Sequence, residues 1–267
     1  MKRNNAGGLA ATNAGYDDKL VETLVREARK EIDRAMRIIR RPQARVSRVD
    51  SPIGELLIAE SDRGIAAVHF LAVSTGDATL DALKRRYELV QNEAARRRVE
   101  RELCRYFAGE TAALDRPVDL GLVDGEFQRR ALKQLRTVPA GAVITYRGLA
   151  AAIGAPSAQR AVGTSMARNP VPIYVPCHRV VKSDGTVGNY GGGAARKLQL
   201  LEIEGFRVGR DRRIPAEAVL GHVTTRIYCL PGCTAAERAS TARLLVFADP
   251  AHARRAGMRA CQVCRPA

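Results

Sequence analysis

Apolar and polar residues alternate with different periods along this chain, and each period predicts a different element. Over residues 17–40 apolar positions recur every three or four residues among charges, which predicts a long amphipathic helix packed against the rest of the protein. Residues 45–71 instead show short alternating runs separated by glycine-containing turns, which predicts antiparallel strands. Helical spacing returns at 80–87 and at 92–107. The first half therefore predicts a small α/β domain behind an N-terminal helix.

The second half is mainly helical in its pattern. A helix is predicted from Asp124 to Leu135. Two short helices, 145–152 and 157–168, then flank a glycine-containing turn, with Ser157 placed to cap the second. This spacing is typical of a helix-turn-helix, although any helical hairpin in a core would share it. A further helix follows residue 193 and ends near Glu204.

The charge of the chain indicates a polyanionic partner. The formal net charge is +16 and the pI is near 10.2, and clustered basic residues attract phosphates. Both ends are more basic than the middle, so the alternative is a basic surface that only keeps the protein in solution. The lack of an 18-residue apolar run predicts no membrane span, and the polar start argues against secretion. We expect a cytoplasmic protein.

One short motif holds the candidate chemistry. Cys177 and His178 are adjacent, and Glu204 follows downstream. A thiol, an imidazole and an orienting carboxylate are the minimum for an activated thiolate nucleophile, whereas an isolated Cys-His pair is more often a buried thiol beside a structural histidine. Cys104, in the helical run before Phe107, is predicted to be a core thiol.

The other cysteines form two close pairs near the C-terminus. Two such pairs on either side of a folded stretch suit a tetrahedral zinc ion, and in a reducing compartment paired cysteines indicate metal more often than disulfide. The predicted ligands are Cys229, Cys233, Cys261 and Cys264. A purely structural zinc is the simplest interpretation.

Six motifs, in order and spacing, resemble the O6-alkylguanine-DNA alkyltransferases, also called methylated-DNA–protein cysteine methyltransferases. The resemblance runs from about Ser47 to Gly205. The matching motifs are Thr145-Tyr146, Ala161-Val-Gly163, Asn169-Pro170, Pro176-Cys-His-Arg-Val180, Gly188-Asn-Tyr190 and Glu204-Gly205.

The resemblance implies an α/β protein built in parts. Residues 1–44 are predicted to be a disordered tail and the amphipathic helix. Residues 45–120 resemble the small ribonuclease-H-like support domain, in which His69 is a strand residue without a function. Residues 121–207 resemble the mainly helical, winged helix-turn-helix-like alkyltransferase domain. Residues 208–267 are predicted to form a small zinc-bound module.

The resemblance also implies the roles of the site residues. Cys177 is the alkyl acceptor, His178 is its base through a water molecule, and Glu204 holds the imidazole. Tyr146 matches the proton donor to the leaving guanine, and Arg179 supports the loop. A thioether has no easy route back to a thiol, so a monomer that acts once and needs no cofactor for this transfer is expected.

The implied partner is double-stranded DNA that carries alkylated guanine, or O4-alkylthymine. An O6-alkyl group is reached only after the base is flipped out of the helix. Arg160 matches the arginine that takes the place of the flipped nucleotide. The small side chains of the second helix would allow close approach to the minor groove, and a pocket wall would be formed by the loop at Tyr190. The residues assigned to DNA are Arg160, Ala161, Gly163, Thr164, Asn169 and Tyr190.

The cysteine-rich end resembles the zinc domain of Ada proteins, which accepts methyl groups from DNA phosphotriesters. By position Cys229 would be this second acceptor. Leu230 stands where that family usually has arginine, and the domain order is reversed, so a zinc-stabilised DNA-docking module is the alternative. For the whole chain, the alternative is a non-catalytic protein that binds lesions or senses methylation.

Overall fold

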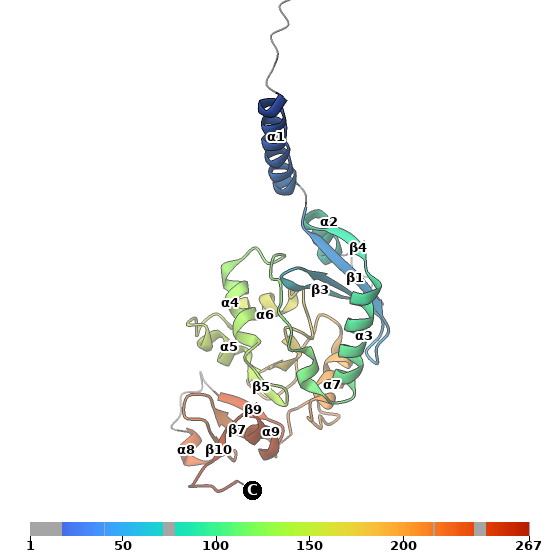
Figure 1. Cartoon of the computed structure of the whole chain (residues 1–267). Coiled ribbons are helices and arrows are strands. Elements are labelled where there is room, and N and C mark those ends of the chain that lie inside the picture. Colours follow the sequence, from blue (N-terminus) through green and yellow to red (C-terminus); the bar gives the residue numbers. More distant parts are fainter. Residues whose placement is uncertain (1–17, 40, 72–77, 216, 238–243, 267) are drawn as a thin grey trace, which may run out of the picture. The chain divides into compact units, whose positions relative to one another are not determined.

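The computed structural model describes residues 18–39, 41–71, 78–215, 217–237 and 244–266 (Figure 1). The chain divides into two compact units, residues 1–41 and 42–267. The predicted disordered tail lies outside the described residues. The first unit holds helix α1 (Asp18–Ile39), as the periodicity predicts. Its apolar side chains Leu20, Leu24 and Ile32 are exposed. Packing of this helix against the rest of the protein stays a prediction.

A four-stranded sheet begins the second unit, in the order β3-β2-β1-β4. The three predicted strands are present as β1 (Gln43–Val49), β2 (Leu56–Ser61) and β3 (Gly64–Phe70), and each antiparallel pair is joined by a tight turn. Strand β4 (Glu88–Gln91) pairs in parallel with β1 and was not predicted, because four residues are too few to show a period.

Two helices accompany this sheet, α2 (Ala78–Arg86) and α3 (Glu93–Phe107). Asn92 caps α3 by accepting a 2.8 Å hydrogen bond from the Ala95 N–H. Val99, Leu103 and Tyr106 form the buried face of α3. Cys104 follows Leu103 by about 100° around the helix and is exposed, so the prediction of a core thiol is wrong.

The helical part follows a short 3-10 turn, η1 (Thr111–Leu114). It consists of α4 (Glu126–Leu135), α5 (Tyr146–Ala152) and α6 (Gln159–Ala167), with strand β5 (Ala142–Thr145) leading into α5. Thr145 caps α5 through its side chain. The predicted Ser157 cap of α6 is wrong: α6 begins at Gln159, so the cap position is Ala158, and no side chain bonds there.

The Cys177 motif forms a 3-10 turn, η2 (Cys177–Arg179), followed by the short strand β6 (Val180–Val181). Helix α7 (Ala194–Ile203) ends at Glu204. Just before η2, Ile173 has a φ of 75°. This backbone conformation is strained for a β-branched residue, and such strain is typical of functional segments.

A second sheet joins the helical part to the C-terminal segment, residues 208–267. Its order is β10-β8-β7-β9-β5-β6. The C-terminal strands are β7 (Val219–His222), β8 (Ile227–Cys229), β9 (Leu244–Phe247) and β10 (Arg259–Ala260), with helices α8 (Thr234–Glu237) and α9 (Pro250–Arg255) between them. Sequence patterns did not predict this sheet, because its partners lie up to about a hundred residues apart.

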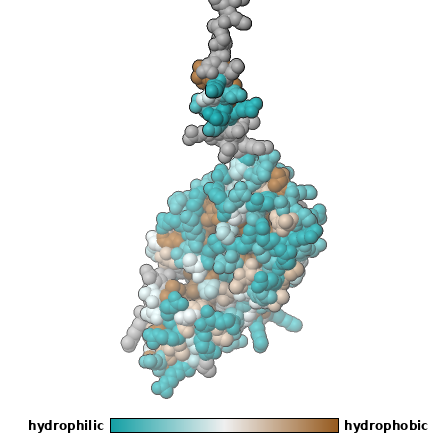
Figure 2. All heavy atoms as spheres, viewed as in Figure 1, coloured by the Kyte–Doolittle hydropathy of each residue, from teal (hydrophilic) through white to brown (hydrophobic). Residues whose placement is uncertain are grey.

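A large hydrophobic core runs through this unit, with smaller clusters beside it. It contains Leu56 and Val99 of the first part, Leu132 and Cys177 of the helical part, and Phe247 of the C-terminal segment. The face of the molecule in Figure 2 is largely hydrophilic, in keeping with the high charge. Among the described residues, no helix combines the length and the apolar character needed to cross a bilayer. The predicted mixed α/β fold with a cysteine-rich end is confirmed.

Candidate active site and metal centre

Cys177 lies at a pocket of about 210 Å³ within the second unit, where strand β3 and the start of helix α2 face α6 and the Cys177 turn. The thiol is buried, with 6% exposure. Strand β3 contributes His69 and Phe70 to the lining, α6 contributes Met166, and the loop before α7 contributes Tyr190, Gly191 and Gly192. The support domain therefore forms part of the pocket wall, and His69, for which no function was predicted, lines the pocket.

Asn169 holds the thiol in place. Its Nδ2 donates to Cys177 Sγ at 3.1 Å and to the Val175 carbonyl at 2.9 Å, and its Oδ1 accepts from the Val171 N–H at 3.0 Å. Every polar atom of this side chain is thus bonded within the active-site segment. Asn169, which we grouped with DNA-contacting residues, therefore lies at the nucleophile in this structure.

The pKa of the thiol reflects opposing effects. Burial raises the pKa of Cys177, while the Asn169 hydrogen bond and the positive charge of Lys197 lower it. Lys197 is completely buried on α7 and donates to the Val180 carbonyl at 2.6 Å. Burial lowers the pKa of Lys197 to about 8. This lysine was not predicted, because a lysine in a helical run gives no sign that it points inward.

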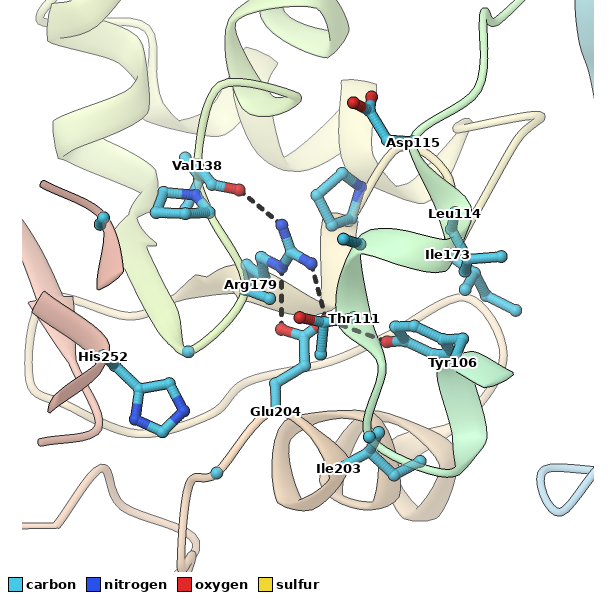
Figure 3. A pocket seen from close by; sticks show the side chains of 18 of the residues that line it. Tyr106, Thr111, Leu114, Asp115, Val138, Ile173, Arg179, Ile203, Glu204 and His252 are labelled. Carbon is cyan, nitrogen blue, oxygen red and sulfur yellow. Dashed lines mark hydrogen bonds and ion pairs between the residues drawn. The ribbon is translucent and has the colours of Figure 1, made fainter. Parts of the chain in front are cut away.

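Glu204 organises the polar side of the site. Its carboxylate accepts from His178 Nε2 at 3.0 Å, from Arg179 Nε and Nη2 at 2.8 and 2.7 Å, and from the Tyr106 hydroxyl at 2.9 Å. Figure 3 shows Arg179 between this carboxylate and the Val138 carbonyl, with Tyr106 reaching in from α3. The structure brings the predicted His178–Glu204 pair together and adds Tyr106, which lies 98 residues from Glu204.

The two partners carry different charges. Burial alone would raise the pKa of the Glu204 carboxyl, but the charges and hydrogen bonds of His178 and Arg179 outweigh burial and hold that pKa well below its usual range. Burial lowers the pKa of His178, although the Glu204 carboxylate opposes this effect. The arrangement is therefore an ionised Glu204 paired with Arg179, beside a neutral imidazole.

One ring nitrogen of His178 is available as a proton acceptor. Its Nε2 faces Glu204, which fixes the proton on that nitrogen. Its Nδ1 is buried and has no hydrogen-bond partner among the described residues. The free lone pair on Nδ1 can therefore accept a proton from the thiol side, directly or through one water.

Tyr146 and Tyr190 both lie near the sulfur. Burial and the proximity of Cys177 raise the pKa of Tyr146, and the same two causes raise the pKa of Tyr190 well above its usual value. Both hydroxyls thus remain protonated and can donate. Phe70 packs edge-on against Tyr190 with ring centroids 6.2 Å apart, and the Arg196 guanidinium lies 5.1 Å from the Phe70 ring centroid. These contacts hold the loop over the pocket.

Helix α6 presents small side chains outward. Arg160, Ala161 and Thr164 are exposed, while Val162, Ser165 and Met166 are buried. Gly163 is half-buried, and a Cβ there would lie 3.9 Å from the Tyr146 ring. Three of the predicted DNA-facing residues, Arg160, Ala161 and Thr164, therefore lie on the exposed side of α6, whose inner side reaches the Cys177 pocket through Met166.

The C-terminal cysteines converge. The parallel pair β8 and β10 brings Cys229 beside Cys261, whose N–H donates to the Tyr228 carbonyl at 2.9 Å. The four sulfur atoms of Cys229, Cys233, Cys261 and Cys264 all lie within 4.8 Å of one another. Tetrahedral zinc with thiolate ligands places sulfurs about 3.8 Å apart. The residues present therefore fit zinc, as the spacing predicted.

Three family models match this chain. The model described as "6-O-methylguanine DNA methyltransferase, ribonuclease-like domain" matches residues 45–120, and the DNA binding domain of the same family matches residues 126–206. The model described as "Metal binding domain of Ada" matches residues 206–267.

Curated proteins and solved structures agree with these matches. A methylated-DNA–protein-cysteine methyltransferase of Mycolicibacterium paratuberculosis is 39% identical over 156 residues, 58% of this chain and 89% of the relative. The bifunctional transcriptional activator/DNA repair enzyme Ada of Escherichia coli is 38% identical over 60% of this chain and 45% of the relative. The structure of Mycobacterium tuberculosis OGT in complex with DNA is 36% identical, with a TM-score of 0.52, over 60% of this chain and 92% of that chain.

We predict that Glu204→Gln lowers the free energy of unfolding by about 3 kcal/mol, because it leaves the Arg179 charge buried without its partner. Urea denaturation measures this difference. Glu202→Gln is the matched control: it lies two residues earlier and is exposed, so it should stay within about 0.5 kcal/mol of wild type. Equal effects of the two changes would contradict the central role of Glu204.

Proposed function

The chain belongs to the methylated-DNA–protein-cysteine methyltransferase family, and from this premise we propose that Cys177 irreversibly accepts the alkyl group of O6-alkylguanine in double-stranded DNA. The observation that carries the proposal is the position of Cys177 at a pocket, held by Asn169 and backed by the His178–Glu204 pair. A DNA-binding protein that merely senses lesions would not need this arrangement around a thiol.

The pocket suits one flipped base. Its volume of about 210 Å³ lies below the roughly 300–1,000 Å³ of sites for drug-sized ligands. The backbone at Gly191 and Gly192 borders it, so a flat ring can approach closely. The exposed face of α6 offers small residues to the minor groove, and Arg160 on that face can stack in the gap that the base leaves. O4-alkylthymine fits the same description as a further substrate.

The reaction is a displacement at carbon. The Cys177 sulfur supplies an electron pair to form the carbon–sulfur bond, and the bond between carbon and guanine O6 breaks with its electrons going to the guanine. His178 Nδ1 takes the thiol proton, and the Tyr146 hydroxyl gives its proton to the leaving guanine. The proton on His178 then returns to Tyr146 through solvent, so the net change is the transfer of one proton from the thiol to the guanine. The thioether stays on the protein, so each molecule acts once and needs no cofactor for this step.

All groups named in this step come from one chain, and we therefore propose that the protein acts as a monomer. None of the six cysteines forms a disulfide in the structure. A reaction that requires a reduced cysteine and DNA favours the cytoplasm.

A second transfer is proposed at the cysteine cluster, because the match to the metal binding domain of Ada coincides with four converging thiols. Zinc held by Cys229, Cys233, Cys261 and Cys264 keeps the thiolates deprotonated. Cys229 would take the methyl group from a DNA methylphosphotriester: its carbon–sulfur bond forms, the carbon–oxygen bond breaks and a phosphodiester anion leaves. Leu230 beside it is 42% exposed, so the surface that would receive this phosphate lacks a charge at that position.

Cys177→Ala should abolish methyl transfer from O6-methylguanine DNA while the protein still binds the lesion. Incubation with DNA that carries a labelled methyl group, followed by peptide mass analysis, measures this. Wild type should gain one methyl on the Cys177 peptide. Cys104→Ala is the control, because that exposed cysteine lies outside the pocket and its loss should leave transfer intact. Label from guanine on the Cys177→Ala protein would refute the assignment.

The rate of guanine transfer should rise with pH between about 6 and 8. Burial raises the pKa of Cys177, so higher pH favours loss of the thiol proton, and the lowered pKa of His178 favours the neutral form of the base. Above the Lys197 pKa of about 8 the rise should flatten, because the lysine charge that favours the thiolate is lost. Single-turnover rates at saturating DNA measure the profile. A rate that falls between pH 6 and 8 would exclude this account.

DNA with methylphosphotriesters should add a methyl to the Cys229 peptide, and purified protein should contain about one equivalent of zinc. Leu230→Arg should speed this transfer about two- to fivefold, the value of one exposed charge pair. Leu230→Gln is the control, since it is polar but uncharged. Zinc without methylation of Cys229 would leave a docking module, and protein without zinc would remove both interpretations.

A further inference from the structure

The C-terminal segment is built into the sheet that carries the Cys177 site. Strand β9 pairs antiparallel with β5, with Ala142 opposite Phe247 and Val143 opposite Val246. On its other edge β5 pairs in parallel with β6, where Ile144 lies opposite Val180. Strand β5 leads directly into Tyr146, and β6 directly follows Cys177–Arg179. Strand β5 is thus held from both sides, and one of those sides is the C-terminal segment.

His252 of α9 sits in a cradle made by two glycines. A Cβ on Gly141 would lie 2.0 Å from His252 Cδ2, and a Cβ on Gly205 would lie 2.6 Å from His252 Cε1. Neither position can therefore carry a side chain while the ring is there. Gly205 directly follows Glu204, and Gly141 directly precedes β5. Figure 3 shows His252 projecting from the C-terminal segment into the hollow that Arg179 and Glu204 also line.

The position of His252 is fixed by its own segment. Its N–H donates to Asp249 Oδ1 at 2.8 Å, and its Nδ1 lies 2.9 Å from the same oxygen. On the other side of α9, Arg254 Nη1 donates to the Tyr228 hydroxyl at 3.0 Å. Tyr228 precedes Cys229 on β8. A short path of contacts therefore runs from the cysteine cluster through α9 to the turn at Glu204.

We propose that the C-terminal segment is a strut for guanine transfer: the ordered cysteine cluster holds α9, and α9 holds His252 against Gly141 and Gly205. His252 is then a positioning residue that acts through β5 and Glu204 and touches neither DNA nor the sulfur. This inference rests on the proposed transfer to Cys177. It implies that loss of the cluster slows guanine repair, although the two cysteine sites are separate.

The first test uses His252→Ala, which keeps all four cysteines. The maximal single-turnover rate of guanine transfer should fall roughly tenfold through misplacement of the catalytic groups, while the half-saturating DNA concentration and the zinc content stay unchanged. His222→Ala, in the same segment but away from the cradle, is the control. An unchanged maximal rate, or a loss of DNA affinity alone, would overturn the proposal.

A double-mutant cycle separates positioning from general destabilisation. Gly141→Ala should slow transfer strongly when His252 is present, because the new methyl group and the ring compete for one space. In the His252→Ala background, Gly141→Ala should reduce the transfer rate less, because the clash with the ring is gone and only the strain of alanine at a φ of 74° remains. If the effects of the two substitutions on the transfer rate are additive, the position of the His252 ring does not act on the site through Gly141.

The second test disrupts the cluster in the full chain. Cys264→Ser should reduce zinc binding, speed amide hydrogen exchange at residues 142–145 and slow transfer to Cys177. Val263→Ser places the same side chain on the neighbouring residue, which is 69% exposed, and should change none of these. The proposal would be wrong if Cys264→Ser left amide exchange at residues 142–145 unchanged. It would also be wrong if exchange became faster while the rate of transfer to Cys177 stayed the same. If wild type accepts no methyl from guanine, the proposed function fails instead, and the exchange data still decide whether the segment holds β5.

Discussion

The buried carboxylate of Glu204 is the interaction on which the rest of the site depends. A buried charge is costly unless it is paired and hydrogen-bonded, and here Arg179, His178 and Tyr106 all bond it. The three donors arrive from the Cys177 turn and from α3 of the ribonuclease-like part. The same carboxylate therefore fixes the tautomer of the imidazole, the path of the Cys177 turn and the contact between the two parts of the molecule.

Burial of the Cys177 thiol has two opposite effects on its reactivity. A thiol with 6% exposure is shielded from water and oxidants, but the same burial raises its pKa and disfavours the thiolate. Asn169 and Lys197 reduce this penalty through one hydrogen bond and one positive charge. Because neither removes the penalty, the thiol needs a proton acceptor, and the buried Nδ1 of His178, which has no hydrogen-bond partner among the described residues, is the group that we propose for this role.

The sequence predicted what depends on local pattern or on a dense motif. Strands β1 to β3, helices α3 to α7, the His178–Glu204 pair and the four-cysteine cluster all follow from spacing or family resemblance. Contacts between distant segments were missed: Tyr106 reaches Glu204 across 98 residues, and His69 lines the pocket. The prediction that Cys104 is buried was wrong. The spacing in a helical run shows that one face of the helix is buried, but it does not show which residues lie just outside that face. Lys197 was missed because buried lysines look like exposed ones in sequence.

The second sheet explains why the C-terminal segment cannot be treated as a tethered addition. Strand β5 has β6 along one edge, and without β9 its other edge would leave the backbone groups of Ala142 and Val143 without strand partners. Unpaired edges are costly when buried and prone to wrong pairing when exposed. Strand β9 covers this edge and adds Phe247 to the core that contains Cys177. The strand that delivers Tyr146 to the pocket is therefore completed by residues more than a hundred positions later in the chain, on the same segment as the cysteine cluster.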